Sequence, residues 1–449
     1  MSRLPNEQEI NAIPNKIASL HKLTKNVKTK STAENLSNSD RPLMLFDLSV
    51  RGHHPAYIQH LIEYFVAESL SGYLVVVVSP RFFEEHHEVI DLSQRHAPDQ
   101  IKFQAISWAE EKMLGQRKTA KQRLKRSAQE WRLLLKYAKA LNAKHCLALY
   151  FDTCLRPLAV SKPLPCSISG IYFRPTFHYP MFAQYQPSYK DRFRHWWEQM
   201  LLVLMGQRSH LHMVFSLDPF AVPQLNRLLG QSKAVHLPDP VALDRAPLDR
   251  VQQLRAELEV DSGRTVALIF GALTRRKGVP KLLEAIAQLS PNEAQKLCLL
   301  LIGESNISED LDNQITGIMQ RLPAQIICRY EFVPEADVSA YFQLADIVLA
   351  PYQQHVGMSG ILLQAAAAGK PVLSSNYGLM GELVTRYQLG LTVDSTKPEA
   401  IAQGLKQCLD QPTNSLGNLS QMQNFAQQNS ARWFAQTIFQ SILPIAHYS

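Results

Sequence analysis

Long apolar runs and paired cysteines are both missing from this sequence. No stretch of about 18 consecutive apolar residues occurs, although a bilayer-spanning helix needs about that length. The first 20 residues also lack the apolar core of an export signal. The six cysteines are scattered, with no Cys-x-x-Cys pair, at positions 146, 154, 166, 298, 328 and 408. We therefore expect no transmembrane helix, reduced and mostly buried thiols, and a cytoplasmic location.

Outside one segment, the sequence also has little excess charge of either sign. The formal net charge is +8, but residues 112–144 hold eleven Lys or Arg against one acid, Glu130. The rest of the chain is therefore close to neutral. A nucleic-acid-binding protein spreads positive charge over its binding face and interleaves aromatic residues. The pattern instead predicts one long basic helix over about 109–142 and no nucleic-acid partner.

The length of 449 residues, with 46% hydrophobic and 19% charged residues, predicts two globular domains. Apolar segments of strand length alternate with amphipathic helical segments, first over residues 43–237 and again over residues 266–393. This alternation is typical of doubly wound parallel sheets. The fold class predicted is therefore α/β, with two Rossmann-like domains that meet at the proline-containing connector 236–241. Residues 1–40 are polar and predict a loose arm.

The stretch 351–374, PYQQHVGMSGILLQAAAAGKPVLS, is typical of a strand, a glycine turn, a buried helix and a second strand. Gly357 and Gly360 allow a sharp bend and the close approach of a ligand. Ser359 suits the N-cap of the helix that follows. Free backbone N–H groups at such a helix start, at the carboxyl edge of a parallel sheet, favour anions. An ordinary turn before a core helix explains the same stretch, so the alternative stays open.

The octet GALTRRKG, residues 271–278, predicts a second anion-binding bend. A strand ends at Gly271 and a helix begins near Gly278, so Arg275, Arg276 and Lys277 lie just before a helix N-terminus. Cations beside free N–H groups suit a diphosphate, although a solvated basic turn is the simpler explanation of the octet alone. Together, the two bends describe the two sides of a nucleotide-diphosphate site.

These residues resemble the retaining, GT-B-fold glycosyltransferases of family 4, also described as glycosyl transferases group 1. GALTRRKG is similar to the family's Gly-Arg-Leu-x-x-x-Lys-Gly segment, and residues 356–372 are similar to its Glu-x7-Glu segment. HLPDPV, residues 236–241, stands in the place of the family's Pro-Asn-Gly-Val-Asp connector. The turn at residues 51–54 is similar to the glycine-rich turn near the acceptor.

The resemblance implies transfer of a sugar from a nucleotide-sugar to a glycan, a lipid-linked acceptor or a small molecule, with retention and without a metal or resident cofactor. It assigns residues 41–240 to an acceptor domain, 241–428 to a nucleotide-sugar domain and 429–449 to a helix that crosses back to the first domain. The implied catalytic residues are Lys277, Arg276, His178 and Arg174. The implied donor-binding residues are Gly271, Arg275, Gly303, Gly357, Met358, Ser359, Gly360 and Gln364. The implied acceptor-binding residues are Gly52, His53 and His54.

Three positions depart from the family pattern. Ala272 replaces a phosphate-binding arginine, Val356 replaces the first glutamate and Gln364 replaces the second, which holds the ribose hydroxyls. An amide still bonds a diol, but without the gain of a charged acceptor. The departures favour an alternative from another class of protein, a non-catalytic homologue that binds a nucleotide or glycan and acts as a partner or regulatory subunit.

Two further patterns have competing explanations. The basic helix, with the segment containing Phe193, Trp196 and Trp197, predicts either peripheral contact with the inner face of a membrane or an ordinary core segment beside solvated lysines. The pair His53-His54 suggests a metal, but we expect adjacent histidines to point apart and to serve the loop instead.

Overall fold

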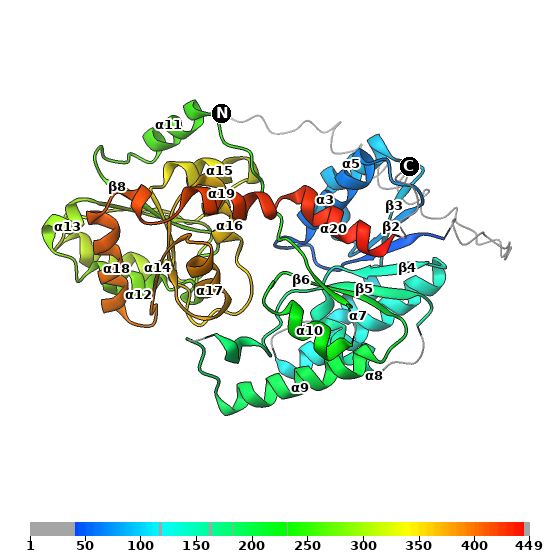
Figure 1. Ribbon diagram of the computed structural model, residues 1–449. Helices are drawn as coiled ribbons and strands as arrows, with labels where there is room; N and C mark the ends of the chain where they lie inside the picture. The colour runs from blue at the N-terminus through cyan, green and yellow to red at the C-terminus, as the bar shows by residue number, and fades with distance from the viewer. Residues whose placement is uncertain (1–40, 116–118, 161–163, 183, 231, 444–449) are drawn as a thin grey trace. The chain divides into compact units, whose positions relative to one another are not determined.

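The computed structural model describes residues 41–115, 119–160, 164–182, 184–230 and 232–443. These residues lie in one compact unit that begins at Arg41. The arm predicted for residues 1–40 lies outside the described residues. Two parallel sheets with helices on their faces make up this unit (Figure 1).

The first sheet contains β1 (Leu43–Phe46), β2 (Leu74–Val78), β3 (Ile101–Ala105), β4 (His145–Ala148), β5 (Ser167–Tyr172), β6 (Leu211–Ser216) and β7 (Ala234–His236). Its order is β3-β2-β1-β4-β5-β6-β7, and every pair is parallel. The helical segments of this region are α3 (His54–Ala67), α4 (Phe82–Glu85), α5 (His87–His96), α6 (Trp108–Leu114), α7 (Ala120–Ala140), η1 (Phe151–Thr153), α8 (Leu155–Val160), η2 (Tyr179–Met181), α9 (Tyr189–Gly206) and α10 (Val222–Leu229).

The second sheet contains β8 (Thr265–Phe270), β9 (Leu297–Ile302), β10 (Gln325–Arg329), β11 (Ile347–Ala350), β12 (Val372–Ser375) and β13 (Gly390–Val393). Its order is β10-β9-β8-β11-β12-β13, again with parallel pairs. The remaining helical segments are α11 (Leu248–Glu257), η3 (Arg275–Lys277), α12 (Val279–Ile286), α13 (Pro291–Gln295), α14 (Ser308–Met319), α15 (Glu335–Leu344), α16 (Gly360–Ala368), α17 (Gly378–Arg386), α18 (Pro398–Asp410), η4 (Thr413–Ser415), α19 (Leu419–Gln428) and α20 (Ala431–Ile442).

The central strands of each sheet are buried on both faces, which explains their continuous apolar runs. In β1, Leu43 and Leu45 pack into one core, whereas Met44 and Phe46 pack into the core on the opposite face. Successive strand residues point to opposite faces, so a sheet covered twice needs apolar residues at every position. The doubly wound α/β fold predicted from the sequence is confirmed.

The single basic helix predicted over residues 109–142 is wrong, because two helices occupy this segment. Helix α6 ends before Gly115, whose backbone has a φ of +63°. Helix α7 starts anew after Thr119, which forms a reciprocal capping pair with Gln122. Glycine in the left-handed region ends helices, and a Thr-x-x-Gln box starts them. Both signals were present in the sequence.

The chain passes between the regions of the two sheets at two places that lie side by side. The backbone N–H of Val241 donates to the carbonyl of Asn429 at 2.9 Å, and the N–H of Asp239 donates to the side chain of Asn429 at 3.0 Å. Helix α20 then packs on α3 through Phe434 and Phe439. The boundaries at residues 240 and 428 remain predictions.

Within the described ranges, no helix has the length and apolar character that crossing a membrane requires.

Candidate functional site

The order of strands in each sheet reverses at one point, between β1 and β4 in the first and between β8 and β11 in the second. At such a switch point, the loops after the two central strands turn in opposite directions and leave a crevice at the carboxyl edge. The bend at 271–278 follows β8, and the bend at 351–360 follows β11. Both predicted anion-binding bends therefore lie at the switch point of the second sheet.

Direct contacts join these two bends. The guanidinium of Arg276 donates to Nδ1 of His355 at 3.1 Å, and the N–H of Gln353 donates to the carbonyl of Arg276 at 2.8 Å. Burial and the charge of Arg276 lower the pKa of His355 to about 4. The imidazole is therefore neutral at pH 7 and can accept the bond. Arg276 also lies over the ring of Tyr352, 5.3 Å from its centre.

Lys277 is the buried cation of this site, with only 6% of its surface exposed. Its ammonium group donates to the carbonyl of Phe270 and lies 5.4 Å from the ring centre of Tyr352. A Cβ added at Gly271 would lie 2.9 Å from this ammonium group, so a glycine there leaves room for the lysine. Burial, with the charge of Arg276 second, lowers the pKa of Lys277 to about 7.

Other predicted donor residues surround the same edge. Gly303 directly follows β9 and lies so close to Gly271 that an added Cβ would lie 2.5 Å from the Gly271 carbonyl. Ser359 precedes α16 as its N-cap, as predicted, but its side chain makes no capping bond and its hydroxyl instead lies 3.4 Å from that of Tyr352. Gly360 begins α16 and is exposed, and Gln364 lies in the second turn.

Arg275 turns away from this cluster. Its guanidinium donates to Asp310 of α14 at 2.8 Å, and both side chains are largely exposed. Val356, in the place of the family's first glutamate, packs with Met358 against the core beneath the second sheet. The acid is thus replaced by a packing residue.

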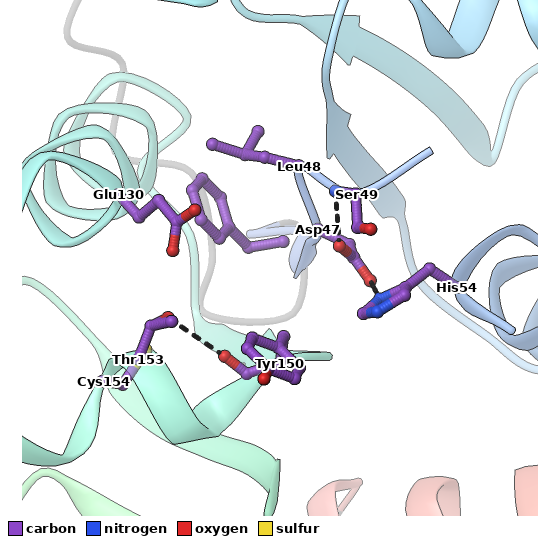
Figure 2. A pocket seen from close by; sticks show the side chains of 9 residues that line it. Asp47, Leu48, Ser49, His54, Glu130, Tyr150, Thr153 and Cys154 are labelled. Atoms are coloured by element: carbon purple, nitrogen blue, oxygen red, sulfur yellow. Dashed lines mark hydrogen bonds and ion pairs between the residues drawn. The ribbon is translucent and has the colours of Figure 1, made fainter. Parts of the chain in front are cut away.

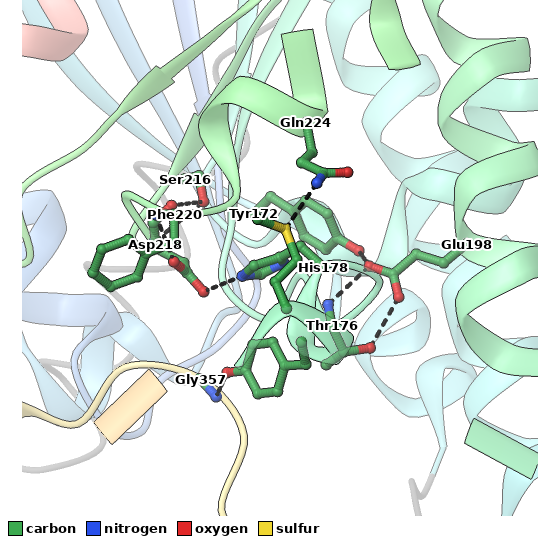
Figure 3. A network of polar contacts seen from close by, with 11 residues as sticks. Tyr172, Thr176, His178, Glu198, Ser216, Asp218, Phe220, Gln224 and Gly357 are labelled. Carbon is green, nitrogen blue, oxygen red and sulfur yellow. Dashed lines mark hydrogen bonds and ion pairs between the residues drawn. The ribbon is translucent and has the colours of Figure 1, made fainter. Parts of the chain in front are cut away.

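The bend at Gly357 is also covered by residues that follow β5. Gly357 has a φ of +96°, and an added Cβ would lie 3.2 Å from Cγ of Arg174. Its N–H donates to the hydroxyl of Tyr179 at 2.7 Å (Figure 3). The N–H of this predicted donor-binding residue is thus engaged in this structure. The contact places Arg174 beside the predicted donor loop, whereas the sequence did not indicate a role for Tyr179.

His178 does not face this edge. Its side chain is 0% exposed, and Nε2 donates to Asp218 at 2.8 Å within a ring of aromatic neighbours (Figure 3). His178, which the resemblance implies as a catalytic residue, is therefore enclosed by protein in this structure. A fully buried imidazole fixed by Asp218 instead holds the turn that carries Tyr179.

A second polar cluster lies at the switch point of the first sheet. Asp47, which follows β1, accepts bonds from the N–H of Ser49 at 2.8 Å and from Nδ1 of His54 at 2.6 Å (Figure 2). With Tyr150 and Thr153, these residues line a cavity of about 20 Å³, room for about one water molecule. Asp47 was missed in the sequence, although its place directly after an apolar strand could have revealed it.

The predicted acceptor residues lie at the same edge. Gly52 has a φ of +71° in the turn before α3, and His53 is the residue before the helix. The rings of His53 and His54 stack with centres 4.6 Å apart, so the expectation that they point apart is wrong. Desolvation by the surrounding protein, and then the neighbouring His54, lowers the pKa of His53 to about 4, although part of the residue stays exposed.

Arg174 connects the two clusters. Its guanidinium donates to the hydroxyl of Tyr150 and lies 3.8 Å from the carboxylate of Asp152, while its alkyl chain reaches Gly357. The ring of Tyr150 contacts the edge of His54 with centres 5.6 Å apart. Contacts therefore run from Asp47 through His54, Tyr150 and Arg174 to the loop at Gly357.

No group of three or more His, Cys, Asp or Glu side chains in the described part of the chain has an arrangement that could hold a metal ion. This includes the residues around Glu84-Glu85-His86, where α4 and α5 are two short helices.

The fold is that of GT-B glycosyltransferases, two Rossmann-like α/β halves. HepE from Anabaena, whose crystal structure holds UDP and glucose, aligns with 89% of this chain and 98% of its own at 15% identity and a TM-score of 0.60. Sucrose-phosphate synthase from Thermosynechococcus elongatus aligns with 89% of this chain and 98% of its own at 15% identity and a TM-score of 0.61. At these identities the similarity concerns the fold alone.

The family comparison concerns the second half of the chain. Residues 251–429 match the family model "Glycosyl transferases group 1". D-inositol 3-phosphate glycosyltransferase from Rhodococcus opacus is 30% identical over 166 residues, which are 35% of this chain and 36% of that protein. Alpha-maltose-1-phosphate synthase from Mycolicibacterium smegmatis is 26% identical over 151 residues, 33% of this chain and 38% of that protein. The matched segment thus spans little more than a third of each relative.

Proposed function

We propose that the protein is a glycosyltransferase that moves a sugar, a hexose by resemblance, from a nucleotide-sugar to an acceptor with retention of the anomeric configuration. The observation that carries the proposal is the joining of the two bends by Arg276 and His355, with Lys277 buried beside them at the switch point. The group 1 family match to residues 251–429 covers both bends.

The chemistry assigned to these residues is electrostatic. When the bond between the sugar and the diphosphate breaks, negative charge grows on the leaving diphosphate. The ammonium of Lys277, the guanidinium of Arg276 and the N–H groups that begin α16 would stabilise this charge. A phosphate oxygen of the donor would accept the acceptor's proton on the same face, as the family resemblance implies, so no side-chain nucleophile is required. We assign the second cation to Arg276 rather than Arg275, because Asp310 holds Arg275 away.

We place the acceptor at the carboxyl edge of the first sheet, near Gly52, His53 and His54. Asp47 fixes the ring of His54 through Nδ1, and Arg174 lies between this edge and the donor loop. Arg174 is therefore a positioning residue for either substrate. His178 would act only indirectly, through the turn that carries Tyr179.

Neither a metal nor a resident cofactor is part of the proposal. Two cations, Lys277 and Arg276, supply the positive charge that a divalent ion would otherwise bring to a diphosphate. A cytoplasmic location completes the proposal. The six cysteines are free thiols, and five of them are buried, as expected in a reducing compartment.

Calorimetric titration with UDP and a transfer assay with a panel of radiolabelled nucleotide-sugars test this function. UDP is the first probe because the fold neighbour HepE was crystallised with it. Replacing Lys277 by Ala should weaken binding by about 10- to 100-fold, since a hydrogen bond to a charged group contributes about 1.5–3 kcal/mol. Arg275→Ala is the matched control and should change affinity less than about threefold, because its partner is Asp310.

The outcomes separate the two hypotheses of function. Transfer of sugar from any donor of the panel to an extract-derived acceptor, lost in Lys277→Ala, supports the enzyme. Binding of nucleotide without turnover of any donor supports the non-catalytic homologue. Equal binding by the wild type and Lys277→Ala contradicts both, because each places the diphosphate at this lysine.

A further inference from the structure

Helix α9 has one buried face and one face that no described element covers. Its buried residues are His195, Glu198, Leu201, Leu202 and Met205. On the opposite side, Phe193, Trp196, Met200 and Val203 are exposed at helical spacing. The exposed fractions are 67% for Phe193 and 52% for Trp196, and Tyr189 at the start of the helix is 90% exposed. We call these five side chains the outer stripe of α9.

Polar bonds fix the rotation of α9 about its own axis. The carboxylate of Glu198 accepts bonds from the hydroxyl of Tyr172 and from the N–H and hydroxyl of Thr176, the last two at 3.1 and 3.0 Å (Figure 3). The hydroxyl of Tyr185 lies 3.2 Å from Nε2 of His195. Rolling the helix to bury the outer stripe would expose Leu202 and Met205 and break the bonds to Glu198. The exposure of the stripe is therefore built into the fold.

The charges around the stripe are mainly positive. Lys190, Arg192 and Arg194 are exposed in the first two turns of α9. Asp191 is engaged at the helix start, where it accepts bonds from Ser188 and lies 2.9 Å from Arg194. The other acid of the helix, Glu198, points inward. From the neighbouring helix α8, Arg156 lies over the ring of Trp197, 5.9 Å from its centre.

We propose that the outer stripe of α9 docks on the surface of an anionic phospholipid bilayer. Tryptophan and tyrosine prefer the interface between headgroups and acyl chains, and apolar side chains of a helix lying in that plane enter the acyl boundary. Each Lys or Arg near an anionic surface adds to the attraction. Phe193 and Trp196 thus lie outside the core, whereas Leu201 and Leu202 of the same helix belong to it. The proposal is carried by α9 and stands independently of the glycosyltransferase function.

Co-sedimentation of the full chain with vesicles tests the docking. Vesicles of phosphatidylcholine alone are compared with vesicles that also contain about 30% phosphatidylglycerol. The anionic lipid gives the second kind of vesicle a negative surface. We expect at least tenfold stronger binding to the anionic vesicles, weakened by salt because screening reduces the attraction. The double variant Phe193→Ser, Trp196→Ser should lose at least tenfold in affinity for them. Lys190→Glu with Arg192→Glu should remove most of the preference for the anionic lipid.

Trp433→Ser is the matched control, because Trp433 is 53% exposed but lies on α20, which packs on α3. Its vesicle binding should equal that of the wild type. All variants replace exposed side chains, so thermal melting and UDP titration should remain unchanged, which separates this test from that of the proposed function. Absence of binding to anionic vesicles at low salt overturns the docking. The docking is also overturned if Trp433→Ser loses as much affinity for the anionic vesicles as the Phe193, Trp196 variant. Self-association that the Phe193, Trp196 variant abolishes would show that a second copy covers the stripe instead.

Discussion

The guanidinium of Arg276 donates to Nδ1 of His355 at 3.1 Å, and this contact joins two bends through residues that are 79 positions apart in the sequence. Because burial and Arg276 keep His355 neutral at pH 7, the bond leaves the positive charge of Arg276 uncompensated. A diphosphate that enters this edge would therefore meet the charge of Arg276 as well as that of Lys277.

The affinity for UDP should depend on pH through Lys277. Burial lowers the pKa of Lys277 to about 7 in the free protein, and only the ammonium form attracts a diphosphate. Between pH 7 and 9, binding must therefore take up a proton, and affinity should fall by up to about tenfold per pH unit. Calorimetry in buffers of different ionisation enthalpy measures the proton uptake. Lys277→Met should show neither the fall nor the uptake, and a wild type with flat affinity over this range would contradict the role of the lysine.

Gly278 should tolerate no side chain, because it has a φ of +77° and an added Cβ would lie 2.0 Å from the carbonyl of Pro351. Gly278→Ala is expected to destabilise the fold by about 2 kcal/mol or more from backbone strain and the clash. It should also push the two bends apart and weaken UDP binding at least tenfold. Thermal melting and UDP titration measure both effects. Gly317→Ala, in α14, is the control.

An added Cβ at Gly317 meets no atom within 4 Å. The control should therefore be neutral or stabilise the helix by up to about 1 kcal/mol. If Gly278→Ala melts and binds UDP like the wild type, the close packing of the two bends determines neither stability nor affinity.

Restoring the family's acid at position 364 should strengthen binding of the ribose. In Gln364→Glu, a carboxylate would accept bonds from two ribose hydroxyls, and charged acceptors form bonds about twice as strong as neutral ones. We expect roughly a fivefold gain for UDP and no gain for an analogue without the ribose hydroxyls. Gln403→Glu, on the exposed side of α18, makes the same charge change elsewhere and should alter neither affinity. Equal gains for UDP and its analogue would refute the ribose contact.

The connector at Asp239 should make stability depend on pH. Burial raises the pKa of Asp239 to about 6, despite the hydrogen bond from Tyr57 that opposes the rise. Between about pH 4 and 6, the folded state then holds more protons than the unfolded state, so this group makes the free energy of unfolding fall as pH rises. A shift of about two units corresponds to about 3 kcal/mol. Urea unfolding from pH 4.5 to 7.5 measures the slope.

Asp239→Asn should reduce this slope, because the amide does not titrate. Asp244→Asn changes an exposed residue just after this connector and should leave the slope as it is in the wild type. If the slope of stability against pH is the same in both variants and in the wild type, Asp239 does not cause the pH dependence.

Local patterns determined much of the fold. The apolar strands, the restart of the alternation after residue 241 and the glycine bends at 271–278 and 357–360 follow from periodicity and from backbone conformations that glycine permits. Helix α19 was not predicted, because its pattern Leu-Ser-Gln-Met-Gln-Asn-Phe-Ala is weakly apolar. The break between α6 and α7 was missed although Gly115 and the Thr119 capping box mark it.

The sequence by itself determined the α/β class and the two bends at strand ends, because strand periodicity, glycine turns and helix starts are local properties. Only the tertiary structure decided which side chains meet. It pairs Arg275 with Asp310 and Arg276 with His355, although the two arginines are adjacent. It buries His178 on Asp218 and turns Trp196 outward. Such outcomes depend on the direction in which each side chain leaves a turn or helix and on partners dozens of residues away, and no local pattern contains that information.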